Sequence, residues 1–137
     1  MPAEWAPHER TVMGWPCREE IWGDQIGQAK ADYAATANAV AAFEPLTMVC
    51  ADARDAAEAR AALTGDVEIV ELAIDDSWMR DSGPIFVRNG DGEVAAVSFR
   101  FNAWGEKYLP YDKDADLPRR LHARIQIDRQ LRAGNRK

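Results

Sequence analysis

Residues 46–72 read LTMVCADARDAAEARAALTGDVEIVEL, and this stretch decides the fold class. The apolar run at 46–50 is typical of a short strand. The alanine-rich stretch that follows, with an aspartate at its start, favours a helix over 52–63 that Gly65 ends. Residues 67–72 alternate apolar and acidic side chains, which is the period of a half-buried strand. Strand, helix and strand in succession predict an α/β protein.

The sequence on either side of this stretch continues the alternation. Residues 11–15 favour a short strand, and Asp24 is placed to cap a helix that runs to about residue 43. Further along, the turn Asn89-Gly90-Asp91-Gly92 separates two β-rich runs, residues 84–87 and 94–101. Asn-Gly and Asp-Gly are strong hairpin signals because both tolerate positive φ. The predicted order is strand, helix, strand, helix, strand and hairpin, with one more helix near the C-terminus.

The composition restricts the class of protein. A chain of 137 residues makes one domain or part of one. Its 47% hydrophobic and 29% charged residues are typical of a soluble globular protein. No apolar run approaches the roughly 18 residues of a membrane-spanning helix, and the first residues lack the features of a secretory signal. We therefore expect a cytoplasmic protein with no membrane partner.

The charge argues against nucleic acid as the main partner. The net charge is −6, whereas phosphate binding requires concentrated Lys and Arg. Residues 117–137 hold six Arg and one Lys against one Asp, a net charge of +6, so the other 116 residues carry −12. Residues 117–131 are expected to be helical, and cationic residues suit the end of a helix. A basic tail that binds RNA or an acidic partner is the alternative, although the acidic body of the chain opposes it.

The residues best suited to chemistry lie between the third strand and the hairpin, at Asp75-Asp76-Ser77-Trp78-Met79-Arg80-Asp81. A carboxylate accepts paired hydrogen bonds from a planar guanidinium, and the face of a tryptophan attracts the same cation. Trp78 and Asp81 therefore suit a guanidinium or ammonium ligand, and Arg80 is placed to orient one of the carboxylates. The alternative is a solvated acidic loop with Trp78 in the core.

Other candidate residues carry less information. Residues 101–108, FNAWGEKY, contain aromatic residues and a glycine that could wall a pocket or cover the end of a sheet. His8 titrates near neutrality, but no neighbour in the sequence orients it, so a surface or packing role is favoured. His122 lies in the basic tail and is a weaker candidate. Cys17 and Cys50 lack the spacing of a zinc site and are expected to be ordinary reduced thiols.

Four motifs taken together resemble consecutive N-terminal motifs of the agmatine deiminases, which belong with the bacterial-type peptidylarginine deiminases. They are PAEWxPHE at 2–9, GWP at 14–16, DDxWxRDxGP at 75–84 and FNAWGxKY at 101–108. Several long motifs in the right order are more specific than any single one. The resemblance covers roughly residues 1–116, which we interpret as the N-terminal part of an agmatine-deiminase-like domain.

The resemblance implies a partial pentein-type α/β propeller of ββαβ modules, incomplete relative to the full family fold. It implies hydrolysis of a guanidino C–N bond, from agmatine to N-carbamoylputrescine and ammonia in putrescine biosynthesis, with no cofactor. In the family a cysteine thiolate attacks the guanidinium carbon, a histidine acts as acid and base, and carboxylates hold the nitrogens. By position, Asp81 matches the catalytic, guanidinium-binding aspartate, and Trp78 matches the tryptophan beside the substrate. Family members often form homo-oligomers.

The chain also departs from the family pattern. The family's Glu-Gly-Gly, His-x-Asp and late nucleophilic cysteine do not occur, and the residue two after His122 is an arginine. Neither Cys17 nor Cys50 matches the nucleophile. Glu106 stands where the family usually has a second glycine. Because the loss of one triad-type member removes several orders of magnitude of rate, we expect the chain to be inactive alone.

Two interpretations of function follow. The first is the truncated N-terminal segment of a guanidine hydrolase, with 117–137 as a divergent basic tail of the kind a frameshift, a premature stop or an incomplete gene model would produce. The second is a non-catalytic remnant that binds cationic guanidines or polyamines weakly through Trp78 and Asp81. The choice between agmatine and peptidyl-arginine as substrate stays open, and the closeness of the motifs leans towards agmatine.

Overall fold

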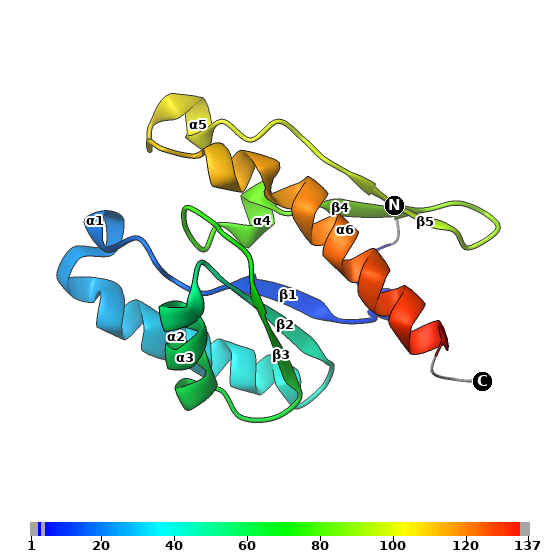
Figure 1. The fold of residues 1–137 in the computed structure, drawn as a ribbon, viewed down its shortest axis with the longest axis horizontal. Helices are drawn as coiled ribbons and strands as arrows, with labels where there is room; N and C mark the ends of the chain where they lie inside the picture. The colour runs from blue at the N-terminus through cyan, green and yellow to red at the C-terminus, as the bar shows by residue number, and fades with distance from the viewer. Residues whose placement is uncertain (1–2, 4, 135–137) are drawn as a thin grey trace. The chain divides into compact units, whose positions relative to one another are not determined.

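The computed structural model describes residue 3 and residues 5–134, with side chains described to residue 125. The chain forms two compact units, the first over Trp5–Met79 and the second starting at Arg80. Each unit has its own β-sheet, three-stranded in the first and two-stranded in the second (Figure 1). Of the helices described, none combines the length and apolar character that crossing a bilayer requires.

The first unit is built on a parallel sheet in the order β1-β2-β3. The strands are β1 (Thr11–Gly14), β2 (Leu46–Cys50) and β3 (Val67–Glu71). Met48 on β2 pairs with Met13 on β1 and Ile69 on β3. The three strands predicted from the sequence are therefore confirmed, two of them one residue shorter than predicted.

Parallel neighbours need crossover connections, which two helices supply. Helix α2 (Ile26–Ala41) links β1 to β2, and α3 (Ala53–Ala62) links β2 to β3. The helices contact each other and both contact β2, so they lie on one face of the sheet (Figure 1). This arrangement follows from strands placed in sequence order, because crossovers of the same hand return to the same face.

The core of the first unit lies between this helical layer and the sheet. Every residue of β2 is buried, with Met48, Val49 and Cys50 at 0% exposure. The alanines on the two helices allow a close approach to the strands, because a methyl side chain takes up little space between the helices and the sheet. The buried cluster consists of Trp15, Ala34, Ala37, Leu46, Met48, Cys50, Ala56 and Ala59.

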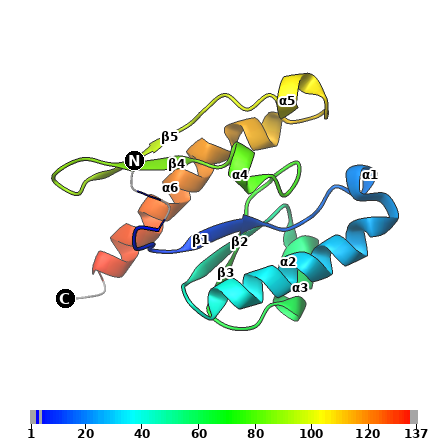
Figure 2. The same cartoon turned by 180° about the vertical axis from the view of Figure 1, so that it is seen from behind.

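The start of α3 was predicted correctly, and the start of α2 was not. Asp52 caps α3 by accepting a hydrogen bond of 2.9 Å from the backbone N–H of Asp55. Asp24 does not cap α2, because it lies inside a 3-10 turn, Gly23–Gln25, that leads directly into the helix. An additional short helix, α1 (Glu19–Trp22), precedes this turn at the N-terminal end of α2 (Figure 2).

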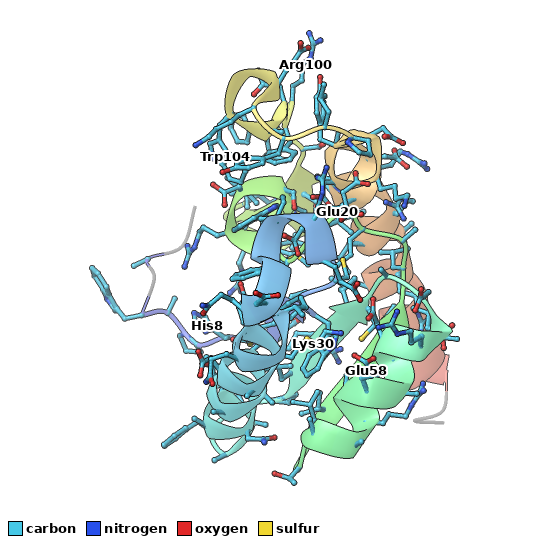
Figure 3. The ribbon with its side chains drawn as sticks, turned by 90° about the vertical axis from the view of Figure 1, so that its left-hand side faces the viewer. His8, Glu20, Lys30, Glu58, Arg100 and Trp104 are labelled. Carbon is cyan, nitrogen blue, oxygen red and sulfur yellow. The ribbon has the colours of Figure 1, made fainter. Side chains whose placement is uncertain are left out.

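Ion pairs connect the three helices of the first unit. Lys30 on α2 pairs with Glu58 on α3, and the two side chains point towards each other (Figure 3). Lys30 also lies 3.6 Å from Asp55, whose pKa is raised by burial, an effect that Lys30 opposes. Arg54 on α3 reaches Glu19 on α1 at 3.2 Å, and both side chains are exposed. Exposed ion pairs contribute little to stability, so the pair of Lys30 with the buried Asp55 contributes more than the exposed pair of Arg54 with Glu19.

The second unit contains the predicted hairpin. Strand β4 (Ile85–Arg88) pairs antiparallel with β5 (Val94–Val97). Asn89 organises the turn, because its side-chain oxygen accepts from the N–H groups of Asp91 at 3.1 Å and Glu93 at 2.8 Å. The second strand ends at Val97, so the prediction that it reaches residue 101 is wrong. Its partner strand begins at Ile85, because the preceding Pro84 has no N–H to continue the ladder.

The last helix is longer than predicted. Helix α6 runs over Asp112–Gly134, with two acidic residues in its first turn, where the helix dipole favours negative charge. Leu117 and Leu121 are fully buried, and α6 contacts β5. The proposed basic tail therefore begins inside this helix, and residues 135–137 of the tail lie outside the described residues. A domain boundary at residue 116 stays a prediction.

Candidate active site

The acidic loop after β3 is buried, so the expectation of a solvated loop is wrong for its first half. Asp75, Asp76 and Ser77 are 8%, 1% and 5% exposed. Trp22 Nε1 donates to both carboxylate oxygens of Asp76 at 3.1 Å, and the backbone N–H of Cys17 lies 3.4 Å from one of them. A buried carboxylate is costly unless it is hydrogen-bonded, and these donors meet that need.

Trp78 packs against a tryptophan that the sequence did not point to. The Trp78 ring stacks on Trp22 with centroids 6.0 Å apart and an interplanar angle of 18°. Trp22 also meets the edge of Tyr33 at 6.3 Å. Ser77 Oγ donates to the Tyr33 hydroxyl at 3.2 Å. No signal in the sequence connects Trp22 with residue 78.

Gly14 lets the end of β1 approach this loop. A Cβ on Gly14 would lie 3.0 Å from the Cα of Ser77, which is too close for a backbone neighbour that cannot rotate away. Trp15 follows, and its N–H donates to Val49 O at 2.8 Å, so β1 keeps its pairing up to the loop. The close approach of the Ser77 backbone therefore explains why position 14 of the Gly-Trp-Pro motif favours a residue without a side chain.

Asp81 lies three residues after Trp78, in the short helix α4 (Met79–Ser82). Its side chain is exposed, as is that of Arg80, whereas Ser82 is 1% exposed. Trp78 belongs to the first compact unit and Asp81 to the second. The roles of Trp78 and Asp81 in binding stay predictions.

The aromatic residues after β5 pack on one another. Phe101, 9% exposed, meets Trp104 edge-on at 5.4 Å and Tyr111 at 6.3 Å. Trp104 in turn meets Tyr108 at 5.9 Å and keeps 47% of its surface exposed. Phe101 therefore has the structural role considered for this segment, whereas Trp104 stays about half exposed.

The backbone of this segment is left-handed. Residues Ala103–Glu106 form the turn α5, in which φ is +49° at Ala103, +55° at Trp104, +82° at Gly105 and +65° at Glu106. Asn102 supports the turn by accepting from the N–H of Gly105 at 3.1 Å. Positive φ favours glycine. Glu106, which stands where the family usually has a second glycine, therefore occupies a position at which a glycine would relieve backbone strain.

The two histidines have structural neighbours. His8 Nδ1 lies 3.3 Å from a carboxylate oxygen of Glu44, and the pKa of Glu44 is lowered by its hydrogen bond from Thr11 and by His8. His122 stacks on Phe86 at 6.4 Å. Its Nδ1 is buried and has no hydrogen-bond partner among the described residues. The surface or packing role favoured for His8 from the sequence fits its ion pair with Glu44.

Neither cysteine is bonded to another sulfur, and their surroundings differ. Cys50 is fully buried, whereas Cys17 is half-buried with its Sγ 3.6 Å from Asp75 O. Burial, aided by the negative charge of Asp55, raises the pKa of the Cys50 thiol to about 12. Within the described part of the chain, no three His, Cys, Asp or Glu side chains are grouped so as to hold a metal ion.

We predict that iodoacetamide modifies Cys17 well before Cys50 in the folded chain. Only the thiolate reacts, and a pKa of about 12 in place of the ordinary 9.0 lowers the thiolate fraction about 10³-fold near neutral pH. The check is mass spectrometry of peptides after timed labelling, with the chain in urea as the control in which both cysteines react. Equal labelling of both thiols in the folded chain would contradict the buried position of Cys50.

Comparison with known proteins places this arrangement in a family. Residues 1–133 match the family described as Porphyromonas-type peptidyl-arginine deiminase. A protein of Stutzerimonas stutzeri named agmatine deiminase is 45% identical over 126 residues, which are 88% of this chain and 34% of that protein. One of Pseudomonas aeruginosa strain LESB58 with the same name is 44% identical over 137 residues, 96% of this chain and 36% of that protein.

A solved structure supports the fold. The structure titled agmatine deiminase of Enterococcus faecalis matches with a TM-score of 0.86 and 31% identity, covering 92% of this chain and 35% of that one. The predicted fold class, α/β and part of a pentein-type propeller, is confirmed by this likeness. The chain spans about a third of the length of the curated relatives it matches.

Proposed function

Since this chain belongs to the Porphyromonas-type peptidyl-arginine deiminase family, we propose that it forms the N-terminal, guanidinium-binding part of a hydrolase that cleaves guanidino C–N bonds. We propose agmatine as the substrate and N-carbamoylputrescine and ammonia as the products. The observation that carries the proposal is the similarity to agmatine deiminases over nearly the whole chain. Peptidyl-arginine is the second candidate substrate, because the name of the matching family points to it.

In this proposal Trp78 and Asp81 bind the guanidinium group. The face of an indole attracts a planar cation, and a carboxylate accepts two parallel N–H donors from it. The stacked position of Trp78 supports the first role, because a ring already held in place loses little freedom on binding. The exposed carboxylate of Asp81 is accessible to a ligand. Exposed charges attract weakly in water, so these 137 residues alone bind weakly.

The chemical step needs a thiolate and an acid–base histidine from outside these residues. Cys50 cannot serve, because its thiol is fully buried and has a pKa raised to about 12. His8 is held by Glu44 at the start of the sheet rather than beside Trp78. A homo-oligomer and a cytoplasmic location are further parts of the proposal, the latter supported by two free cysteines.

The test is a hybrid enzyme. Residues 1–133 of this chain replace the matching N-terminal third of the Pseudomonas aeruginosa relative, and ammonia release from agmatine is measured. We expect kcat/KM within about tenfold of the parent enzyme, a difference below about 1.4 kcal/mol in transition-state stabilisation. The 137-residue chain alone is expected to release no ammonia. The parent enzyme without its N-terminal third is the inactive control.

Different outcomes separate the alternatives. A well-folded hybrid that binds agmatine without hydrolysing it would favour the non-catalytic binding remnant. Steady ammonia release by the 137-residue chain alone would refute the expectation that it is inactive by itself. Hydrolysis of peptidyl-arginine in place of agmatine would change the substrate and leave the reaction type unchanged.

A further inference from the structure

We propose that Trp22 and Asp76 are positioning residues for Trp78, the tryptophan to which the proposed function assigns the guanidinium ligand. The inference rests on the function proposed above only for the identity of the ligand. The positioning itself is a property of the first compact unit, because all three side chains belong to Trp5–Met79.

One face of the Trp78 ring is occupied. Trp22 lies nearly parallel to it, with ring centroids 6.0 Å apart and an interplanar angle of 18°. Two indole rings at this separation leave no space for a third planar group between them. A cation therefore cannot bind the face of Trp78 that Trp22 covers.

Trp22 is held in turn by a buried carboxylate. Its Nε1 lies 3.1 Å from both oxygens of Asp76, a side chain that is 1% exposed. A hydrogen bond is directional, so it fixes the orientation of the Trp22 ring as well as its position. Asp76 and Trp78 are two residues apart in one loop. The hydrogen bond and the ring stack therefore close a loop of contacts that runs from Asp76 through Trp22 to Trp78.

The backbone between these two residues is also fixed. Ser77 donates through Oγ to the Tyr33 hydroxyl at 3.2 Å. The Cα of Ser77 lies against Gly14, where an added Cβ would be 3.0 Å away. Supports thus come from β1, from α1 and from α2, and they converge on the three residues that end in Trp78. Such a set restrains the ring more than burial of an apolar side chain would.

NMR of the indole N–H signals tests the positioning in the full 137-residue chain. The chain has five tryptophans, and assignment by single substitution identifies each signal. Trp22→Phe is expected to shift the Trp78 signal, because the ring current of the stacked indole is lost. Trp5→Phe is the matched control, since Trp5 is 89% exposed, and it leaves the Trp78 signal in place. An unchanged Trp78 signal in Trp22→Phe would overturn the proposal.

Two substitutions at Asp76 separate positioning from simple packing. Asp76→Asn keeps an acceptor oxygen for the Trp22 N–H, and it is expected to preserve both the Trp22 and Trp78 signals. Asp76→Leu keeps the branched shape of the side chain, is larger and has no acceptor, and it is expected to shift both signals. Both Asp76 variants retain Trp22 and Trp78, so they decide the point even if Trp22→Phe does not fold. Preserved signals in Asp76→Leu would overturn the role of Asp76.

Agmatine provides the functional arm of the experiment. In the hybrid enzyme, Trp22→Phe and Asp76→Leu are expected to raise KM about three- to tenfold with kcat nearly unchanged, because binding is lost equally in ground and transition states. Asp76→Asn is expected to restore KM. Equal losses in kcat for all three variants, with KM unchanged, would overturn the positioning role. An inactive unsubstituted hybrid would refute the proposed function, and the NMR result would still decide the positioning.

Discussion

Replacing Asp81 with Asn in the hybrid enzyme is expected to lower kcat/KM for agmatine about 10³-fold, a loss of about 4 kcal/mol in transition-state stabilisation. A carboxylate that holds two guanidinium nitrogens loses both its charge and one acceptor in this substitution. The remaining charged substrate then lies in the site without its counter-charge, which is more costly than the loss of an ordinary hydrogen bond. The measurement is steady-state ammonia release over a range of agmatine concentrations.

The matched control for Asp81 is Asp91→Asn. Asp91 lies at the hairpin turn, is exposed, and contributes its backbone N–H rather than its carboxylate to the bond with Asn89. It undergoes the same change of charge without any role in the proposed site, so kcat/KM should stay within about twofold of the unsubstituted hybrid. If the Asp81 variant retained full activity, the role that the family resemblance implies for Asp81 would be refuted.

Replacing Met48 with Ala is expected to destabilise the chain by about 3 kcal/mol. Met48 is fully buried at the centre of the middle strand, with Met13 and Ile69 opposite it on the two neighbouring strands. Truncation leaves a cavity that two helices and two strands would have to close. Whole small domains are stable by only about 5–15 kcal/mol, so this is a large fraction of the total. Urea denaturation followed by circular dichroism measures it.

Two variants control the Met48 prediction. Met48→Leu conserves the volume and is expected to cost less than about 1.5 kcal/mol. Phe43→Ala removes a larger side chain that is 92% exposed, and it should change the free energy of unfolding by no more than about 0.5 kcal/mol. A loss in Phe43→Ala as large as that in Met48→Ala would contradict the core described for the first unit.

The sequence predicted the elements of the first unit well because local patterns controlled them. The apolar run of β2, the alternation of β3 and the cap at Asp52 are each set within a few residues. The misplaced start of α2 shows the limit of such reasoning. Asp24 has the chemistry of a cap, but Gly23, with φ of +52°, turns the chain just before it, and the 3-10 turn continues into the helix.

The candidate site was predicted only in part. The residue types at Trp78 and Asp81 suggested a cation ligand, and the resemblance of the surrounding motif to the family implied their roles. The burial of Asp76 did not follow, since an acidic loop is normally solvated and no local rule sends this carboxylate inside. Its donor, Trp22, is 54 residues away in the chain, and a contact at that separation has no periodic or spacing signature.

The sequence by itself determined the order of the strands and of the three long helices, the hairpin turn and the residue types that suit a guanidinium. These depend on side-chain periodicity, on capping and on motif spacing, all of which are local along the chain. Tertiary structure alone decided that Trp22 covers one face of Trp78, that Asp76 holds Trp22, and that Gly14 must lack a side chain. Those facts depend on which segments the parallel sheet and its two crossover helices bring together, and the closeness of distant segments is fixed only when the core packs.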